Sequence, residues 1–329
     1  MEHIRLFKKP RLRNPYMVVA WPGMGEVAFK VGSVLVEKLR AEEFGVIRPD
    51  KFFHLTGSVV RDGILDVPSL PESAFYYWKH PVNRKQKDPR DLIVFLSNAQ
   101  PDLALAEEYA RSILMVARLF KVSTIISLAS MPQPIDHLQQ PSVWGAATSD
   151  DMREAMRDFN LHLLSEAQIS GMNGLFLGLA KREGFKGICL LGEIPLYTIQ
   201  IENPKAALAV LDVLTSMVGI GIDTGDLIEQ SRSMELEINK LMEYFKTGQH
   251  GSRPAPIGED EIERIKKALS QLTRLPASVK DRIEKLFSLS GNDPARAVEL
   301  KAELDKWSVY KEYEDRFLDL FRKDKKEQS

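Results

Sequence analysis

Short apolar runs alternate with amphipathic segments along the first two-thirds of the chain, and this alternation limits the fold more than any other feature. Residues 16–21 form an apolar run that ends at Pro22, and residues 27–39 then carry apolar side chains at helical spacing. The same order returns at the apolar run 91–97, which is followed by a helical pattern after Pro101. Such alternation is typical of a sheet with helices on both faces. We therefore predict an α/β fold with a mostly parallel sheet.

The remaining elements of this region follow from the same patterns. Further strands are expected at 52–60, 74–80, 124–128 and 187–191, and further helices at 151–159, 173–183 and 204–219. Residues 61–63 are expected to form the turn between the strands at 52–60 and 74–80, and residues 130–150 a loop rich in proline and small residues. The longest apolar stretch, 206–222, is shorter than the roughly 20 residues that span a bilayer, so we interpret it as a buried helix.

The character of the sequence changes after Gly225. A charged amphipathic helix is expected over 227–245, and a polar linker rich in glycine and proline over 247–258. We predict an α/β domain over 1–226 and a helical C-terminal region over 227–329. An apolar stripe in this region has to pack against the same chain or another one. Its members are Leu300, Leu304, Trp307, Tyr310, Tyr313, Phe317, Leu320 and Phe321.

Charge and cysteine content argue against several kinds of partner and site. The 45 basic and 46 acidic side chains give a formal net charge of −1, so nothing favours a nucleic acid or an anionic membrane as the partner. The single cysteine, Cys189, allows no intramolecular disulfide and no cysteine-based zinc site. Residues 1–13 are basic but lack the apolar run of a signal peptide. We expect a cytoplasmic protein.

The first candidate site is the glycine bend after the strand at 16–21. Gly23, Met24 and Gly25 belong to a G-x-G-x-x-A pattern whose backbone amides could hold an anion at the start of a helix. A dinucleotide site would also need an acidic residue at the end of the next strand, and Asp50 precedes that strand instead. Glu26 in the first helical turn would repel a phosphate, although it is a candidate catalytic carboxylate. A closely packed turn is the preferred interpretation.

A second glycine bend opens the helix near residue 173. Gly171, Asn173 and Gly174 are candidate ligand-binding residues, with Ser170 or Asn173 available as a helix cap. At the ends of other strands stand polar side chains that could converge on the same edge of the sheet. These side chains are Glu26, Asn98, Ser130 and Glu193, of which Glu26, Ser130 and Glu193 are candidates for catalysis. Caps, turns and rim residues are the preferred interpretation of the same positions.

Other catalytic arrangements have little support. The sequence holds no G-x-S-x-G elbow, and Cys189 lies inside an apolar strand. The pair Asp136-His137 could polarise Ser130, but a solvated loop pair is the preferred interpretation. The six histidines are not spaced as helical metal ligands, so we expect no metal and no cofactor.

The glycine segments and their order resemble the proteasome assembly chaperone 2 family over roughly residues 15–226. The segments that carry the resemblance are Trp21-Pro-Gly-Met-Gly-Glu26, Thr56-Gly57, Ile169-Ser-Gly-Met-Asn-Gly174, Gly187-Ile-Cys-Leu-Leu-Gly-Glu-Ile-Pro195, Tyr197 and Asn203-Pro-Lys-Ala-Ala207. The resemblance implies a three-layer α/β/α sandwich of the phosphorylase/hydrolase-like kind, assembled as a trimer or another small ring. Members in eukaryotes are non-catalytic chaperones for proteasome α-subunit rings.

Two hypotheses about function follow. The first is a non-catalytic, homo-oligomeric assembly factor with a protein partner, and a trimer is the favoured oligomer. Some relatives dock through a hydrophobic-Tyr-x tail, whereas this chain ends in Lys325-Lys-Glu-Gln-Ser329, so tail docking is not expected. The alternative is a small-molecule or phosphate-binding enzyme that uses the glycine bends together with Glu26, Ser130 and Glu193.

Overall fold

The computed structural model describes residues 3–55, 57–61, 63–81, 89–247, 283–287, 290, 294–306, 313 and 316–317. By their contacts these residues fall into two compact units. The first lies within residues 1–57 and 68–269, and the second within residues 58–67 and 270–329.

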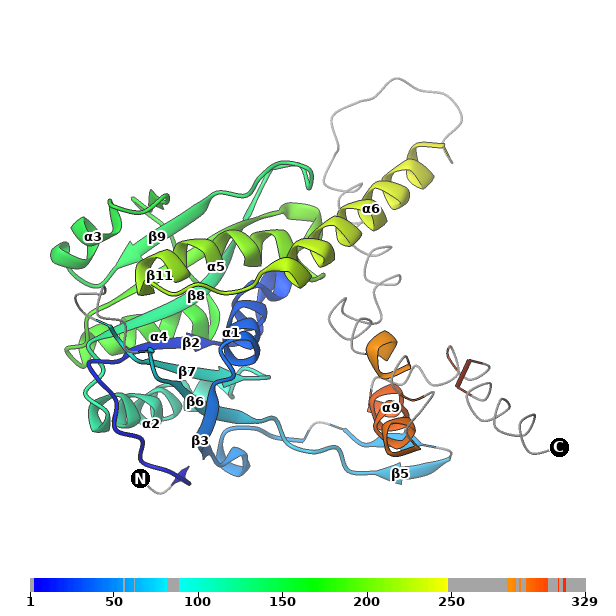
Figure 1. Cartoon of the computed structure of the whole chain (residues 1–329), viewed down its shortest axis with the longest axis horizontal. Coiled ribbons are helices and arrows are strands. Elements are labelled where there is room, and N and C mark those ends of the chain that lie inside the picture. Colours follow the sequence, from blue (N-terminus) through cyan, green and yellow to red (C-terminus); the bar gives the residue numbers. More distant parts are fainter. Residues whose placement is uncertain are drawn as a thin grey trace. The chain divides into compact units, whose positions relative to one another are not determined.

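The first unit contains a large sheet and the helices around it (Figure 1). Its strands are β1 (Ile4–Leu6), β2 (Tyr16–Ala20), β3 (Glu42–Ile47), β6 (Ser73–Trp78), β7 (Leu92–Ser97), β8 (Thr124–Gln133), β9 (Val143–Ala147), β10 (His162–Leu163) and β11 (Gly187–Pro195). Its α-helices are α1 (Val27–Lys38), α2 (Ala106–Leu119), α3 (Asp150–Met156), α4 (Gly171–Arg182), α5 (Pro204–Val218) and α6 (Gly225–Thr247). Short 3₁₀ turns are η1 (Met24–Glu26), η2 (Pro49–Lys51), η3 (Leu103–Leu105) and η4 (Leu196–Thr198).

The sheet is mixed, with a parallel centre. Its strand order is β1-β3-β6-β7-β2-β8-β11-β9-β10, and the neighbours β7, β2, β8 and β11 run parallel. The pairs β1–β3, β3–β6, β6–β7 and β11–β9 are antiparallel. The prediction of a mostly parallel sheet is therefore wrong for the β1-β3-β6-β7 side and for β9 beside β11, whereas β9 and β10 are parallel. β9 follows β8 through residues 134–142, which form no helix, and pairs antiparallel with β11.

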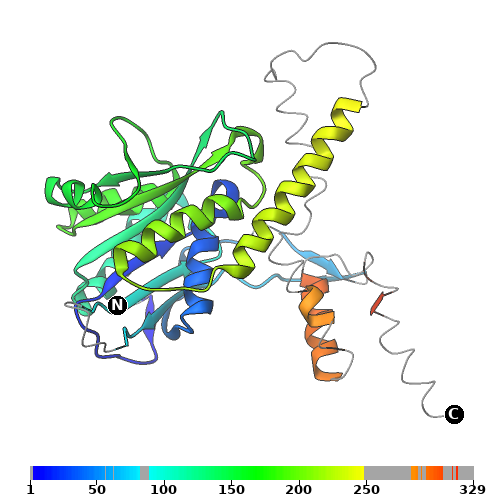
Figure 2. The ribbon, with the colours of Figure 1, turned by 45° about the horizontal axis from the view of Figure 1, so that its top comes forward.

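Helices cover both faces of this sheet, so the predicted three-layer α/β/α arrangement is confirmed. The core on one face joins the apolar sides of α2 and α4 to the strands, and the core on the other face joins α1 and α5. Figures 1 and 2 show these two pairs of helices on opposite sides of the sheet. In α2 the buried residues Tyr109, Ile113 and Val116 recur at helical spacing, as the sequence predicted.

The sequence predictions fail locally in several places. β1, β3 and β10 were not predicted, and β9 lies inside the segment 130–150 that was expected to be a loop. The residues around 61–63 connect β4 (Val59–Arg61) to β5 (Ile64–Asp66), a separate two-stranded hairpin, rather than the strands expected at 52–60 and 74–80. The short β9 run Val-Trp-Gly-Ala-Ala has little β pattern of its own, so pairing with β11 determines its conformation.

The second unit contains the β4–β5 hairpin and C-terminal helical residues, including α9 (Pro294–Lys306). Leu300, Leu304 and Phe317 of the predicted stripe are buried together with Ile283, Leu286 and Phe287, and Tyr313 packs against them. The described part of the stripe thus packs within its own chain. Trp307, Tyr310, Leu320 and Phe321 lie outside the described residues, as do residues 248–258 of the predicted linker. Contacts assign α6 to the first unit, although the predicted boundary at 226 placed it in the C-terminal region.

Candidate functional site

The carboxyl ends of four parallel strands point toward the same edge of the sheet, which we call the carboxyl rim. Val19 of β2 is level with Ser127 of β8, which continues to Gln133, so β8 and its partner β11 extend beyond β2 and β7. It consists of the segments that leave β2, β7, β8 and β11, namely residues 21–26, 98–105, 134–142 and 196–203. Ligands of open α/β sheets bind at this edge, so the rim is the first place to look for a site.

The structure brings the two predicted glycine bends together at this rim. Asn173 is buried and receives a hydrogen bond from the backbone N–H of Trp21 at 3.1 Å, while its Nδ2 donates to the Trp21 carbonyl oxygen, also at 3.1 Å. A Cβ atom on Gly23 would lie 3.1 Å from Asn173 Nδ2, so the first bend leaves little room there. Asn173 thus acts as a clamp between α4 and the end of β2.

Gln100 forms a second bridge between the bends. Its Nε2 donates to the carbonyl oxygen of Pro22 at 2.7 Å, and its Oε1 accepts from the backbone N–H of Met172 at 3.0 Å. Gly171 has a φ of +72°, and a Cβ there would lie 2.9 Å from Gln100 Oε1. The first-turn amide of Met172 in α4 is therefore bonded to a protein side chain. Gln100 was not among the predicted residues, and no local motif marks it.

Gly25 joins the first bend to the segment between β11 and α5. Its φ of +65° lies in the left-handed region, and its N–H donates to the Ile199 carbonyl at 2.9 Å. The N–H of Asn203 in turn donates to the Gly25 carbonyl at 2.8 Å. A Cβ on Gly25 would lie 2.8 Å from Asn203 Nδ2, so this close approach requires glycine.

Glu26 combines an unusual backbone with an unusual charge environment. Its φ of +53° is left-handed, a conformation that costs a non-glycine residue about 1 kcal/mol. Nearby, Lys30 Nζ and Glu202 Oε2 form an ion pair at 3.1 Å whose side chains are each only 9% exposed. Burial, together with repulsion from Glu202, raises the pKa of Glu26 to about 7, although Lys30 opposes this change. This carboxyl group is therefore partly protonated at neutral pH.

We expect Glu26 to make the protein less stable as the pH rises. Its usual pKa is 4.5, so between about pH 4.5 and 7 the unfolded chain loses a proton that the folded protein retains. Because the side chain is partly exposed, the expected loss of unfolding free energy is about 1–2 kcal/mol. Urea unfolding at a series of pH values should show this decline, and Glu26→Gln should flatten it.

Asp212 provides the matched control for Glu26. Burial also raises the pKa of this carboxyl group, but no charged neighbour contributes to the change. Asp212→Asn should therefore leave most of the slope between pH 5 and 8 in place. Identical slopes in the wild type and Glu26→Gln would show that Glu26 is ionised in the folded protein.

The other polar side chains predicted to converge at this edge bond to their own neighbours. Ser130 Oγ donates to the carbonyl oxygen of Met24 at 2.6 Å, and Asn98 Oδ1 accepts from the Glu72 N–H at 2.9 Å. Glu193 is buried and accepts from Trp144 Nε1 at 2.7 Å and from the Ser142 N–H at 2.9 Å. Each of these hydrogen bonds holds a segment at the rim to a neighbouring strand or segment.

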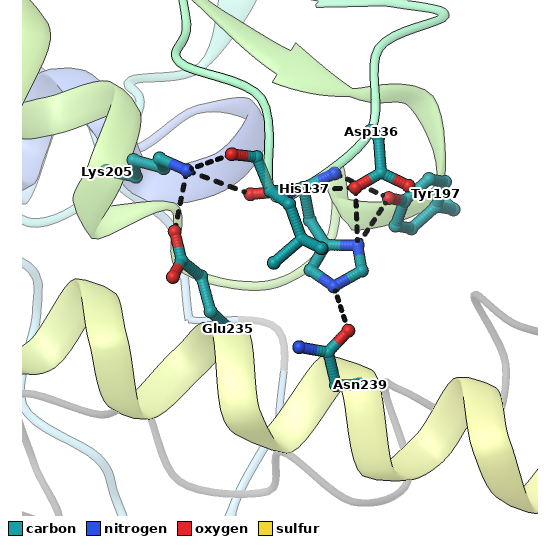
Figure 3. A network of polar contacts seen from close by, with 7 residues as sticks. Asp136, His137, Tyr197, Lys205, Glu235 and Asn239 are labelled. Atoms are coloured by element: carbon teal, nitrogen blue, oxygen red, sulfur yellow. Dashed lines mark hydrogen bonds and ion pairs between the residues drawn. The ribbon is translucent and has the colours of Figure 1, made fainter.

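His137 lies in a buried polar network instead of a solvated loop (Figure 3). The hydroxyl of Tyr197 accepts the backbone N–H of His137 at 2.8 Å and lies 2.8 Å from its Nδ1, while Nε2 lies 2.9 Å from Asn239 Oδ1. Burial raises the pKa of Tyr197 to about 12, so its hydroxyl keeps its proton. All three contacts are satisfied when Tyr197 donates to Nδ1 and Nε2–H donates to Asn239. His137 therefore links α6 to the rim.

Lys205 completes this link from the first turn of α5. Its Nζ lies 2.6 Å from Glu235 of α6 and donates to the carbonyl oxygens of Leu138, at 2.8 Å, and His137, at 3.3 Å (Figure 3). A cavity of about 30 Å³ lies beside these groups, between α6 and the rim. Such a volume holds only a few water molecules. Neither Lys205 nor Asn239 is among the predicted site residues, because their partners are far away along the chain.

Tyr197→Phe is expected to lower the free energy of unfolding by about 1–3 kcal/mol, because the backbone N–H and the Nδ1 of His137 both lose their buried hydroxyl partner. Urea unfolding at pH 7 measures this free energy. Tyr77→Phe is the matched control, since the Tyr77 hydroxyl donates to Glu42 on an exposed surface and its loss should cost less than about 0.5 kcal/mol. Equal costs for the two variants would contradict the linking role of the network.

Cysteine and metal chemistry find no support within the described residues. Burial raises the pKa of the Cys189 thiol to about 11, so the reactive thiolate is scarce. In the part of the chain that the structure describes, no three His, Cys, Asp or Glu side chains are grouped as metal ligands would be. Over the same part, no helix has the length and apolarity needed to span a membrane.

The carboxyl rim also exposes one large apolar side chain from each of its four segments. Leu103 follows β7 and is 72% exposed, and Met24 follows β2 and is 40% exposed. Leu138 follows β8 with 56% exposure, and Leu196 follows β11 with 37%. The segment after β2 leads to α1 on one face of the sheet, whereas the segment after β7 leads to η3 and α2 on the other face.

Comparison with known proteins identifies the family. Solved structures with the same fold include PbaB of Pyrococcus furiosus, an archaeal proteasome activator, with 27% identity and a TM-score of 0.61 over 73% of this chain and 98% of PbaB. PbaA of the same organism, an archaeal homologue of a proteasome-assembly chaperone, has 23% identity and a TM-score of 0.55 over 74% of this chain and 99% of PbaA.

Sequence comparison agrees with the structures. An uncharacterised protein of Methanocaldococcus jannaschii is 24% identical over 257 residues, which cover 77% of this chain and 93% of that protein. The sequence model of the PAC2 family matches residues 17–242, a span that contains the whole carboxyl rim and most of α6. The chain therefore belongs to the PAC2 family.

Proposed function

We propose that this chain is a non-catalytic, homo-oligomeric assembly factor that binds protein partners through its carboxyl rim. The rim itself carries this proposal. Its predicted polar residues bond mainly to the backbone of the rim and of its neighbours, whereas its four segments each expose an apolar side chain. A contiguous exposed apolar surface is typical of protein–protein contact sites, and our proposal requires the rim segments to form such a surface in the assembled protein.

The relatives suggest which partner to test. PbaB is a proteasome activator and PbaA is a homologue of a proteasome-assembly chaperone, and both cover most of the PAC2 region of this chain. We therefore propose proteasome subunits as partners and a trimer as the favoured assembly. We further propose a cytoplasmic location.

Purified chain mixed with proteasome α-subunits from the same organism tests this function. We expect co-elution in size-exclusion chromatography with light scattering, faster formation of α-subunit rings, and a closed trimer of the chain alone. A strictly monomeric chain that neither binds the subunits nor changes ring assembly would overturn the proposal.

A small-molecule enzyme or binder is the second candidate, because Glu26 has a pKa near neutrality beside a glycine bend. This reading uses the bends at Gly23 and Gly171, with Ser130 and Glu193 acting on the ligand. Thermal-shift screening with nucleotides and phosphorylated metabolites separates the candidates, since a ligand at 100 times its Kd adds about 2.7 kcal/mol of stability. We expect no shift, because Gln100 already occupies the amide of Met172.

A further inference from the structure

The β4–β5 hairpin concentrates exposed apolar side chains in a short segment (Figure 1). Val60 in β4 is 63% exposed, and Ile64 and Leu65 in β5 are each 71% exposed. Val67, directly after β5, is 67% exposed. None of the four belongs to an apolar core cluster of the described residues. Exposed apolar side chains that lie this close together mark a contact surface.

The strand register distributes these side chains over both faces of the hairpin. Val60 lies directly opposite Leu65, so the two share one face, which we call face A. Ile64 precedes Leu65 in β5, and the half-buried Val59 precedes Val60 in β4, so both lie on the other face, face B. Each face thus exposes an apolar side chain, whereas a sheet that covers a core within its own chain buries one of its faces.

The hairpin is a small sheet by itself. β4 and β5 have three residues each and pair with each other, and no third described strand joins them. At the turn, Gly63 has a φ of +79°, and a Cβ atom there would meet no described atom within 4 Å. Two-stranded hairpins are marginally stable in water unless a face packs against something else. A neighbour against each face would supply this packing.

We propose that the β4–β5 hairpin joins copies of this chain in a closed three-fold ring, with face A of each hairpin packed on face B of the next. This inference rests on the proposed homo-oligomer and names its contact surface. Each hairpin of such a ring has two neighbours, which cover its two faces. A head-to-tail contact of this kind forms a ring when the rotation from copy to copy closes. Three copies make the smallest ring in which each hairpin has two different neighbours.

Two other occupants fit the hairpin less well. A two-fold contact pairs one face with the same face of a second copy, so it would leave the other apolar face exposed. A negatively charged lipid surface attracts clusters of lysine and arginine, but residues 58–67 hold one arginine and two aspartates. Further copies of the hairpin cover both faces with apolar side chains.

Light scattering after size-exclusion chromatography of the full chain tests this contact. Val60→Ser combined with Leu65→Ser removes the apolar side chains of face A, and Ile64→Ser removes the exposed apolar side chain of face B. Each variant should raise the chain concentration needed for the trimer by about tenfold. Leu236→Ser is the matched control, because Leu236 of α6 is 60% exposed and its replacement should leave the trimer unchanged.

A mixture of the two hairpin variants shows which faces meet. The Ile64→Ser chain keeps face A, and the chain with Val60→Ser and Leu65→Ser keeps face B. At a concentration where each variant alone is monomeric, an equimolar mixture should therefore form a heterodimer with one intact contact. A homodimer of the Ile64→Ser chain would indicate a two-fold contact through face A and would overturn the three-fold ring.

The remaining outcomes separate this inference from the proposed function. A monomeric wild type, a trimer that survives both hairpin variants, or equal dissociation by Leu236→Ser would overturn the inference. Hairpin variants that stay trimeric but no longer bind proteasome α-subunits would identify a different protein as the occupant, so the inference would fail while the proposed function stands. If the hairpin variants become monomeric and the wild-type trimer binds no α-subunit, the inference stands and the proposed partner fails.

Discussion

Asn173→Ala is expected to lower the free energy of unfolding by about 3 kcal/mol, one of the two largest effects that the structure predicts. The substitution removes both hydrogen bonds to Trp21 and leaves its buried N–H and carbonyl group without these partners. Each unsatisfied buried group costs about 1–3 kcal/mol. Trp21 is also fully buried against Phe95 and Phe176, with ring centroids 5.4 Å away in both cases, so the bend has little freedom to find water.

Asn98→Ala is the matched control for this variant. Asn98 also lies at the carboxyl rim and also accepts a backbone N–H, that of Glu72, but it is exposed. Water can replace its side chain, and the expected cost is below about 1 kcal/mol. Urea unfolding of both variants at pH 7 gives the comparison. Similar small costs for the two would mean that Asn173 does not clamp the bends, and would return it to the predicted ligand-binding role.

Gly174→Ala is expected to destabilise the protein by about 3 kcal/mol, although alanine favours helices. A Cβ at residue 174 would lie 2.4 Å from the backbone oxygen of Ile169 and 2.5 Å from the Ile169 Cβ. Relief of this overlap requires a backbone shift at the bend that precedes α4. The unfolding free energy measures the cost, and hydrogen exchange of the α4 amides shows whether the first turn opens.

Gly178 of the same helix supplies a control with the opposite sign. A Cβ at this position meets nothing within 4 Å, and the residue is exposed. Gly178→Ala should therefore stabilise the protein by about 0.4–1 kcal/mol, because it reduces the entropy of the unfolded chain. If both variants stabilise the protein, helix propensity outweighs the close packing inferred at Gly174.

Together these variants distinguish the two interpretations of the glycine bends. If the bends bind a ligand, these substitutions should lower the affinity for that ligand and leave the stability of the unliganded protein unchanged. Loss of a clamp or of close packing lowers the stability of the protein with no ligand present. The contacts of Asn173, Gln100 and Gly25 support the second interpretation, because each joins one segment of the rim to another.

The sequence by itself determined the elements whose signal is local. Apolar spacing predicted α1, α2 and α5, and short apolar runs predicted β2, β7 and β11, because the sheet core imposes these periods on any strand or helix that it buries. The glycine patterns likewise located both bends, since positive φ at Gly25 and Gly171 restricts the residue type.

Only the tertiary structure decided what each functional candidate contacts. Asn173 meets Trp21 across 152 residues of sequence, and His137 meets Asn239 across 102, so no local window contains both partners. The strand order set these pairings, and with them the insertion of β9 and the burial of His137. The periodicity of a segment predicts which of its faces is buried. The identity of the neighbours on that face depends on the topology of the whole sheet.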